Sequence, residues 1–374
     1  MRAFQVTISY VLLFLVVLEI ERKLRLASRA LTYLEDNRRD ASEESFEASP
    51  ELSRALQRIR SPAVLLLNQY ALNITLNYLC NVVSYPDVIQ RLLVFSFDGT
   101  ATHAIESAFP NVTVIHWPIE PFQRTFKAGE PSYQFFQLFR ASLSAFLSTR
   151  TDGFWMIQSD TLWRRNLFHV VDTKTLLSNG ENLLFDQEGE SGLLAKMIAG
   201  GCYYAAPGLK SQKFFRNLSA SLRRYFLTDN NVMGQMCITE FEGNKCAFIP
   251  YRTMTNWRWQ SSDRSFVGDF LQYDGGSSSE GKLKKLQRIG ADFVDPDSLG
   301  ASKVARCDPW KSTHPEEAIS EEILRQKDQI SKNRLNVSIN FFHSISEFLF
   351  FHFPILGKFL ISKVFPYYAY YLVV

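Results

Sequence analysis

The sequence lacks the short motifs of several common enzyme classes. It has no GxSxG, GxxxxGK[ST] or HExxH pattern, and no GxGxxG follows its first strand-like apolar run. These patterns provide the nucleophile elbow of many hydrolases, the phosphate-binding loop, the zinc ligands of metalloproteases and the dinucleotide-binding turn. Their absence argues against hydrolase, kinase and dinucleotide-dependent chemistry.

The sequence also has little net charge and few cysteines. Lys and Arg number 41 against 38 Asp and Glu, a formal net charge of +3, so no basic surplus predicts a nucleic-acid partner. The five cysteines form no CxxC pair that would indicate a metal site. In an oxidising compartment they allow two disulfides and one free thiol, and Cys237 with Cys246 is the expected pair because a turn-like stretch separates them.

The chain nevertheless has enough apolar residues to build a large core. Its 374 residues are 46% hydrophobic and 21% charged, which excludes a disordered protein. This length predicts one large domain or two ordinary ones.

An apolar segment stands at the N-terminus. Residues 4–18 contain no charged side chain, and charged residues follow from Glu19 onward. The segment is shorter than the ~20 residues that span an average bilayer, so it fits either a cleaved secretory signal or a short anchor. We favour a retained signal anchor over residues 1–20, followed by a charged stalk over residues 21–60.

Two features disagree about the side of the membrane on which the chain lies. Basic residues between Arg22 and Arg29 favour the cytoplasm by the positive-inside rule. Asn-x-Ser/Thr glycosylation acceptors favour the lumen. These acceptors are Asn73, Asn111, Asn217 and Asn336. We expect a single-pass protein of the Golgi or endoplasmic reticulum membrane with a lumenal domain, secreted if the N-terminal segment is cleaved.

The C-terminal tail, residues 341–374, is rich in aromatic and aliphatic side chains. Pro354, Lys358, Lys363 and Pro366 interrupt its apolar runs, which argues against a spanning helix. The tail fits a segment lying in the membrane interface and, equally well, a helix packed on the folded domain.

Between these ends, strand-like and helix-like segments alternate. Short apolar runs predict strands at 63–67, 92–97, 112–116, 154–157, 182–185, 197–206 and 247–249. Helical spacing predicts helices at 73–83, 101–109, 133–147 and 213–226. This alternation predicts an α/β fold with a mixed, mainly parallel sheet and helices on both faces. We place this domain at residues 61–310 and a C-terminal extension at residues 311–374.

Three loops of this sheet are expected to lie along one edge. They follow Leu67, Phe97 and Ile157, and the carboxyl ends of parallel strands are where open α/β sheets bind ligands. Asp160 stands in the third loop, so its carboxylate is a candidate functional group. It fits equally well as the cap of a helix that begins near Leu162.

Three further features have both a functional and a structural interpretation. Gly200 and Gly201, inside a predicted strand, suit the close approach of a ligand or a second backbone, although a bulge is the commoner cause. Asp229 stands at the start of a helix and fits a simple cap. Lys282, behind a loop rich in Gly and Ser, suits a phosphate, whereas clustered lysines usually mark a solvated helix face.

The segment QSDTLWRRNLF, residues 158–168, resembles the Asp-x-Asp-x-x-Trp segment of the nucleotide-diphospho-sugar transferase family. These are glycosyltransferases of GT-A fold, and the order of features over residues 61–300 is most similar to a nematode-type branch. Asp160 takes the place of the second Asp, Trp163 of the Trp, and Gln158 of the first Asp. The resemblance implies a divalent metal at Asp160, Mn2+ above all, with one charge removed by Gln158.

The resemblance also implies donor-binding roles elsewhere in the chain. The residues matched to nucleotide-sugar-binding positions are Asn68, Asp98, Arg140, Gln158, Gly200, Gly201, Asn230 and Lys282. Asp229, together with Asn230, matches an Asp-Gln pair that faces the sugar, which makes Asp229 the candidate catalytic group beside Asp160. Gln272 stands where the family has a histidine.

These residue types suit the transfer of a sugar from a nucleotide diphosphate. The leaving diphosphate develops negative charge, which a cation at Asp160 together with Arg140 and Lys282 would neutralise. We therefore expect a glycosyltransferase that uses a UDP-sugar, a divalent metal and an acceptor hydroxyl on a glycan or protein. A catalytically degenerate binder of sugar nucleotide or glycan and a membrane-associated scaffold are the alternatives.

Overall fold

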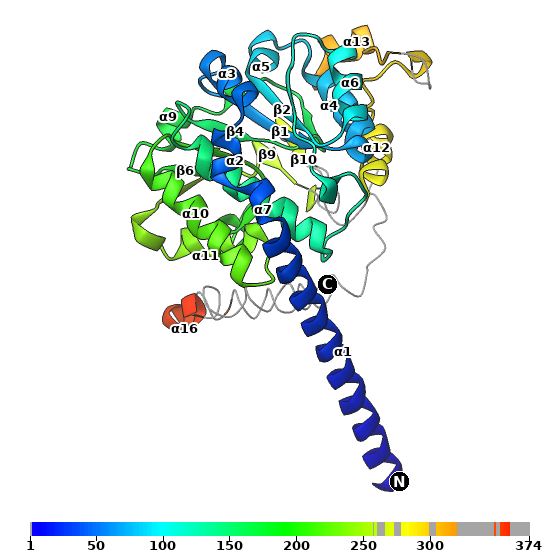
Figure 1. Cartoon of the computed structure of the whole chain (residues 1–374), viewed down its shortest axis with the longest axis vertical. Coiled ribbons are helices and arrows are strands. Elements are labelled where there is room, and N and C mark those ends of the chain that lie inside the picture. The colour runs from blue at the N-terminus through cyan, green and yellow to red at the C-terminus, as the bar shows by residue number, and fades with distance from the viewer. Residues whose placement is uncertain are drawn as a thin grey trace.

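Figure 1 shows the computed structural model of the chain. The structure describes residues 2–256, 258–259, 266–272, 278–298, 304–319, 348 and 352–359. In the first helix, the side chains of residues 2–13 and of Val16 lie outside the described set. Strands and helices alternate from Ala63 onward, as the apolar pattern predicts.

A seven-stranded sheet forms the centre of the fold. Its strands are β1 (Ala63–Leu67), β2 (Leu92–Ser96), β3 (Thr113–His116), β4 (Phe154–Met156), β6 (Leu183–Gln187), β7 (Ile198–Ala205) and β8 (Cys246–Ile249). They lie in the order β3-β2-β1-β4-β7-β6-β8. Only β7 runs antiparallel to its neighbours, β4 and β6, and the other adjacent pairs are parallel. The predicted mixed, mainly parallel sheet is therefore confirmed.

Successive side chains of each strand point to opposite faces of the sheet. Helices cover both faces, so both sets of side chains are buried. In β4, Trp155 packs into one core cluster, whereas Phe154 and Met156 pack into the other. The first face is covered by α4 (Leu72–Val82), α5 (Pro86–Arg91), α6 (Gly99–Ala108), α8 (Leu167–Val170), α9 (Thr173–Leu176) and α12 (Ser279–Arg288). The second face is covered by α2 (Glu43–Glu47), α3 (Pro50–Arg58), α7 (Pro131–Leu147), α10 (Leu209–Arg224) and α11 (Asp229–Ile238).

A second, three-stranded sheet lies beyond β4. It consists of β5 (Thr161–Trp163), β10 (Phe270–Gln272) and β9 (Met254–Thr255), in that order. The Asn81 side chain of α4 holds β5 in place, since its oxygen accepts from the Trp163 amide at 2.7 Å and its nitrogen donates to the Trp163 carbonyl at 2.8 Å. The Trp163 ring is buried against Tyr78 and Phe270. A strand therefore replaces the helix considered near Leu162.

Much of the predicted stalk packs on the folded domain. Helix α1 (Arg2–Asn37) packs on α7 through its C-terminal half, where Ala30 and Leu34 are buried. A short turn, η1 (Arg38–Ala41), leads to α2, whose Phe46 is fully buried. Figure 1 shows the rest of α1 projecting from the body of the molecule. Of the predicted stalk, only the part before Ala27 lacks buried side chains.

The projecting part of α1 carries exposed apolar side chains. They are Phe14, Leu15, Val17, Leu18, Ile20 and Leu24, each 43% to 61% exposed. Within the described part of the chain, no helix combines the length and the apolar character that crossing a membrane requires. The signal anchor at residues 1–20 stays a prediction, and most of its side chains lie outside the described residues.

Two disulfides cross-link the domain, one locally and one between distant segments. Cys237 bonds Cys246, as predicted, and Cys80 bonds Cys307 across 227 residues, leaving Cys202 free and buried. The second bridge ties α4 to the segment that contains α13 (Pro309–Thr313) and η8 (Pro315–Glu317). Of the C-terminal tail, the structure describes little beyond α16 (Pro354–Phe359), so the interpretations of residues 341–374 fall largely outside the described residues.

Candidate active site

Asp160 lies in the loop between β4 and β5, beyond the carboxyl end of β4. Its side chain is 9% exposed and faces α12 across the loop, where the Lys282 ammonium contacts Oδ2 at 2.5 Å. Lys282 belongs to the first turn of α12 and its side chain is 22% exposed. Because β5 follows Asp160 directly and no helix begins there, the interpretation of Asp160 as a helix cap is wrong.

Gln158 lies between Asp160 and Arg140 of α7 and can bond both. In the amide orientation that satisfies its neighbours, its nitrogen donates to Asp160 Oδ1 and its oxygen accepts from Arg140 Nη1, each at 3.2 Å. In the opposite amide orientation, the Gln158 oxygen instead accepts a hydrogen bond from Gln272 Nε2 of β10 at 2.6 Å. One polar atom of the buried Gln272 amide has no hydrogen-bond partner among the described residues. Gln158 itself is partly exposed, so this end of the site is accessible.

Arg140 and Asp229 form a buried ion pair. Arg140 Nε lies 3.1 Å from Asp229 Oδ2, both side chains are 6% exposed, and Nη2 donates to the Gly200 carbonyl at 2.7 Å. Burial alone lowers the pKa of Arg140, but attraction to Asp229 and to further neighbours outweighs it, so the pKa is raised. The structure buries Arg140 as a fixed cation.

Asp229 occupies the first turn of α11 without being its cap. The cap is Thr228, whose hydroxyl accepts from the Asn231 amide, whereas the Asp229 amide donates to Gln137 Oε1 at 3.2 Å. The neighbouring Asn230 is partly exposed and donates to the Ala199 carbonyl at 2.9 Å. Asp229 and Asn230 therefore stand beside β7.

Gly200 and Gly201 allow two side chains to approach β7 closely. Gly200 has φ +82°, and a Cβ added there would lie 2.5 Å from Asn230 Cγ. A Cβ on Gly201 would lie 2.0 Å from Gln272 Nε2. Neither position has room for a side chain, because Asn230 and Gln272 fill that space. The close approach of side chains is thus one reason for the two glycines. The bulge is also present, because the register between β6 and β7 shifts between Phe185 and Gln187.

Asp186 is a site residue for which the sequence predicted no role. Its two carboxylate oxygens accept from the backbone amides of Gly200, Gly201 and Cys202 at 2.8 to 3.0 Å. Burial raises the pKa of Asp186 to about 6, although these three hydrogen bonds and Arg140 oppose the shift. One sequence feature could have identified Asp186: it is a carboxylate that directly follows the apolar run 182–185. Its strand, β6, lies two strands away from β4, which precedes Asp160.

Two other predicted donor-binding residues have structural partners in neighbouring loops. Asn68 donates to the carbonyls of Phe122 and Arg124 at 2.8 and 3.2 Å. Asp98 caps α6 through the Ala101 amide and accepts from the Gln69 amide at 2.6 Å. The last contact shows that the loops after β1 and β2 adjoin, as the parallel sheet requires. Within the described part of the chain, Asn68 and Asp98 bond to these neighbouring segments and not to Asp160.

The contacts thus join most of the predicted residues into one set, here called the polar network. Its members are Lys282, Asp160, Gln158, Gln272, Arg140, Asp229 and Asn230, with Gly200, Gly201 and Asp186 supporting them. It presents two cations, two carboxylates and three side-chain amides. Cations and amides of this kind neutralise phosphate charge and bind hydroxyl groups.

The donor atoms near Asp160 that belong to described residues do not make a divalent metal site. Dications such as Mn2+ prefer several oxygen ligands with carboxylates among them. Among the residues that the structure describes, no three His, Cys, Asp or Glu side chains gather in a way that could hold a metal. Asp160 Oδ2 contacts the Lys282 ammonium, and Asp229 is paired with Arg140. A dication at Asp160 would meet a positive charge at contact distance.

Three predicted glycosylation acceptors can be placed. Asn73 and Asn111 are exposed, whereas Asn217 is half-buried on α10 and donates to Glu242 Oε2 at 3.2 Å. Asn336 lies outside the described residues. Their glycosylation stays a prediction.

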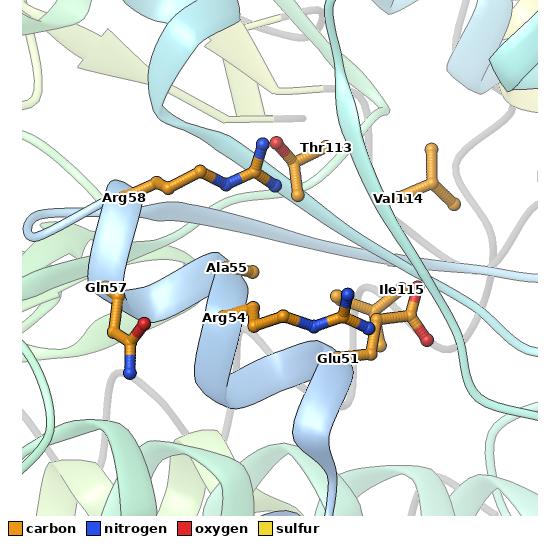
Figure 2. Close-up of a pocket in the computed structure, with 8 residues that line it drawn as sticks. All are labelled: Glu51, Arg54, Ala55, Gln57, Arg58, Thr113, Val114 and Ile115. Atoms are coloured by element: carbon orange, nitrogen blue, oxygen red, sulfur yellow. The ribbon is translucent and has the colours of Figure 1, made fainter.

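A cavity of about 510 Å3 lies away from the polar network, between α3 and the edge strand β3. Figure 2 shows Arg54 and Arg58 extending from α3 toward the strand residues Thr113 and Ile115. Two strands, β2 and β1, separate β3 from β4 in the sheet. This cavity is therefore distinct from the candidate active site.

Several solved structures are similar to part of the chain. The apo form of the bifunctional glycosyltransferase WbbM is 12% identical, with a TM-score of 0.40, over 60% of this chain and 49% of its own. A glycosyltransferase involved in glycosylation of the major capsid of PBCV-1 is 10% identical, with a TM-score of 0.36, over 61% of this chain and 100% of its own. Mouse xyloside xylosyltransferase 1 is 9% identical, with a TM-score of 0.37, over 57% of this chain and 97% of its own. This chain thus spans about half the length of the first of these proteins.

The family of the chain follows from its sequence match. No curated protein matches it significantly. The family model for nucleotide-diphospho-sugar transferases matches residues 87–286, more than half of the chain. The matched range contains the whole polar network, from Arg140 to Lys282. The chain therefore belongs to the nucleotide-diphospho-sugar transferase family.

Proposed function

We propose that the polar network transfers a sugar from a UDP-linked donor to a hydroxyl group of a glycan or protein. The observation that carries this proposal is the unbroken series of contacts from Lys282 through Asp160 and Gln158 to Arg140. It lies beyond the carboxyl end of β4, and Lys282, Gln158 and Asn230 remain partly exposed there. A donor thus has accessible polar groups to bind.

The two cations suit the leaving diphosphate. As the bond between sugar and phosphate breaks, negative charge grows on the diphosphate, and fixed positive groups stabilise it most when they are already in position. Arg140 is held by Asp229 and by the Gly200 carbonyl, so it needs no rearrangement. Lys282 is the more accessible cation and is placed to contact the phosphate directly.

Asp229 is better suited to positioning than to accepting a proton. Its Oδ2 is paired with Arg140 inside the protein, and its Oδ1 accepts from the Asn230 amide at 2.9 Å. A carboxylate with both oxygens engaged orients its neighbours. The role that we propose for Asp229 is therefore to hold Arg140 and Asn230 toward the donor sugar.

Metal assistance stays a prediction that rests on the family resemblance. The family's Asp-x-Asp segment implies Mn2+, but the donors around Asp160 described above do not favour it. No step of the proposed mechanism depends on a metal.

A panel of UDP-sugars tests the function. The expected result is release of UDP from at least one donor, abolished by Asp160→Ala. Asp152→Ala is the matched control, because Asp152 is an exposed carboxylate paired with Arg60 far from the site. Full turnover by folded Asp160→Ala protein would contradict the assignment of the site.

One observation favours a second function, the binding of a sugar nucleotide without turnover. Gln158 and Gln272 stand where the resemblance places an acid and a histidine, and their amides contact each other at 2.6 Å. UDP binding by calorimetry with no turnover of any donor would establish this function. Unchanged activity after deletion of residues 341–374 would dismiss the third candidate, a scaffold that acts through its tail.

We also propose that the apolar end of α1 anchors the chain to the Golgi or endoplasmic reticulum membrane, with the domain in the lumen. The exposed apolar side chains of α1 and the two disulfides support this location. Glycosidase treatment should lower the mass of the expressed chain, and Asn73→Gln with Asn111→Gln should remove most of that shift. A chain without any glycan would contradict the lumenal location.

A further inference from the structure

The cavity between α3 and β3 lies at an edge of the central sheet. Within the described part of the chain, β3 is the last strand on its side and pairs only with β2. An edge strand presents backbone N–H and C=O groups that no neighbouring strand binds. Ala55, Val114 and Ile115, which line the cavity, are buried and apolar. The cavity thus combines a strand edge with an apolar wall, two features that favour the addition of a further strand.

The pairing of β3 with β2 shows which backbone groups reach the edge. The Trp117 amide donates to the Ser96 carbonyl of β2 at 2.8 Å. Alternate residues of a strand direct their backbone groups to opposite sides, so Thr113 and Ile115 face β2, as Trp117 does. Val114, between them, directs its N–H and C=O groups to the edge. A strand added there would therefore bond the backbone of Val114.

Two arginines of α3 extend toward this edge. Arg54 and Arg58 lie one helical turn apart and are exposed. Figure 2 shows Arg58 extending toward Thr113 and Arg54 toward Ile115. Arg54 Nε donates to the Pro50 carbonyl at 3.3 Å, and neither guanidinium pairs with a carboxylate of a described residue. Both guanidinium groups can therefore bind an anionic group that enters the cavity.

We propose that this cavity binds an extended acidic segment of a partner protein, which adds to β3 as a further strand. Residues of the added strand opposite Thr113 and Ile115 point to the face of the sheet that α3 covers, because Ile115 packs on that face. They stand two residues apart, about 6.6 Å in an extended chain, close to the ~6 Å between side chains one turn apart on a helix. Acidic side chains at these two positions would meet Arg58 and Arg54. The residue between them points to the other face, where Val114 packs, and suits an apolar side chain.

Charge distinguishes this occupant from a second copy of the chain. Two copies paired through β3 would bring the same arginines close together, and like charges across a pair of strands are destabilising. A segment with the pattern acid-x-acid instead neutralises both arginines. The cavity is separate from the polar network, so this inference is independent of the proposed transfer reaction.

Fluorescence anisotropy of a labelled peptide tests the proposal. The probe is Thr-Thr-Glu-Val-Glu-Thr-Thr, and the full chain is first treated with an endoglycosidase, because the acceptor Asn111 lies two residues before Thr113. We expect saturable binding that weakens as the salt concentration rises.

Two control peptides examine charge and spacing. One has Lys in place of both Glu residues, and the other has adjacent glutamates, Thr-Thr-Glu-Glu-Val-Thr-Thr. Both should bind at least about threefold more weakly than the probe. Equal binding of all three peptides would overturn the proposal. So would a lack of binding by the probe, and the arginines would then serve to keep the edge from pairing. These titrations need no variant of the chain.

Variants of α3 identify the arginines. Arg54→Ala and Arg58→Ala should each weaken binding of the probe roughly 3- to 10-fold, since exposed ion pairs contribute modestly. Arg60→Ala is the matched control, because this exposed arginine follows α3 closely but pairs with Asp152. The double variant Arg54→Glu with Arg58→Glu should lose the probe and bind the peptide that contains Lys. Unchanged affinity for the probe in all of these variants would overturn the proposal.

Two further measurements distinguish this site from other functions. Inorganic phosphate should displace the probe no more than chloride of equal ionic strength does, and specific displacement by phosphate would indicate a site for small anions and overturn the proposal. Arg54→Ala and Arg58→Ala should leave turnover of a UDP-sugar unchanged, and a loss of turnover would contradict a separate docking site. A chain that binds the probe but turns over no UDP-sugar would contradict the proposed function and leave this inference in place.

Discussion

Two ion pairs lie in one network, and they differ in exposure. Arg140 and Asp229 are each 6% exposed, whereas Lys282 is 22% exposed against 9% for Asp160. In the first pair, here called the inner pair, the Arg140 guanidinium also donates to the Gly200 carbonyl. In the second, here called the outer pair, the Lys282 side chain is partly exposed. One charge is therefore enclosed by the fold, whereas the other is partly exposed to solvent.

The inner pair owes its position to the strands beneath it. Gly200 offers its carbonyl to Arg140, and the Gly200 amide donates to Asp186. The outer pair bridges two separate segments, the loop after β4 and the first turn of α12. We therefore expect that removing a charge from the inner pair lowers stability and that removing one from the outer pair weakens donor binding.

The largest expected effect is that of Arg140→Ala. The substitution leaves Asp229 buried without a counter-charge, which typically costs about 3–5 kcal/mol. Urea unfolding followed by circular dichroism measures the free energy of unfolding. The double variant Arg140→Met with Asp229→Leu is the control, because removing both charges avoids the unpaired carboxylate and should restore part of the loss. Equal stability of the wild type and Arg140→Ala would contradict the role of the inner pair.

An intermediate effect is expected from Asp186, and it depends on pH. The pKa of this buried carboxyl is raised from 3.8 to about 6, so the folded state keeps a proton that the unfolded state releases near pH 4. Stability from this residue is fully present below pH 4 and is lost as the pH rises through 6. The loss is roughly 1.4 kcal/mol per pH unit inside that window.

Asp186→Asn cannot titrate and should lack this dependence. Urea unfolding of both proteins between pH 4 and pH 7 gives the difference in their free energies of unfolding. We expect that difference to shift in favour of the variant as the pH rises through the window and to level off above it. A difference that stays constant with pH would show that Asp186 is not the titrating group.

Much of the fold was predictable because its signals are local. Short apolar runs bounded by polar residues marked the strands of the central sheet, and α7 followed from helical spacing over residues 133–147. The three-residue strand β5 was missed, since Asp160 before Leu162 is also a good helix start. Asn81, distant in sequence, decides the outcome by holding both backbone polar groups of Trp163.

The sequence identified most residues of the site, but not which of them contact one another. Residue types and the family resemblance singled out Asp160, Arg140, Asp229 and Lys282, but they did not predict that Lys282 contacts Asp160. Which cation meets which carboxylate depends on α12 approaching the loop after β4, a contact across 122 residues. Asp186 was missed because its partners are backbone amides, which leave no mark in the sequence.

The smallest effect on stability is expected from Asp160→Asn, although its effect on function should be large. The variant breaks the outer pair while keeping the shape of the side chain. Because Lys282 is partly exposed, water takes over part of its interaction, and the loss of stability should stay at about 1 kcal/mol or less. Turnover of the UDP-sugar should nevertheless fall at least about 100-fold, because the ammonium is no longer held at the diphosphate. Thermal unfolding and donor turnover measured on the same preparation test both statements. A loss of stability as large as that of Arg140→Ala would mean that the two pairs serve the fold alike, and the difference in exposure would then carry no functional meaning.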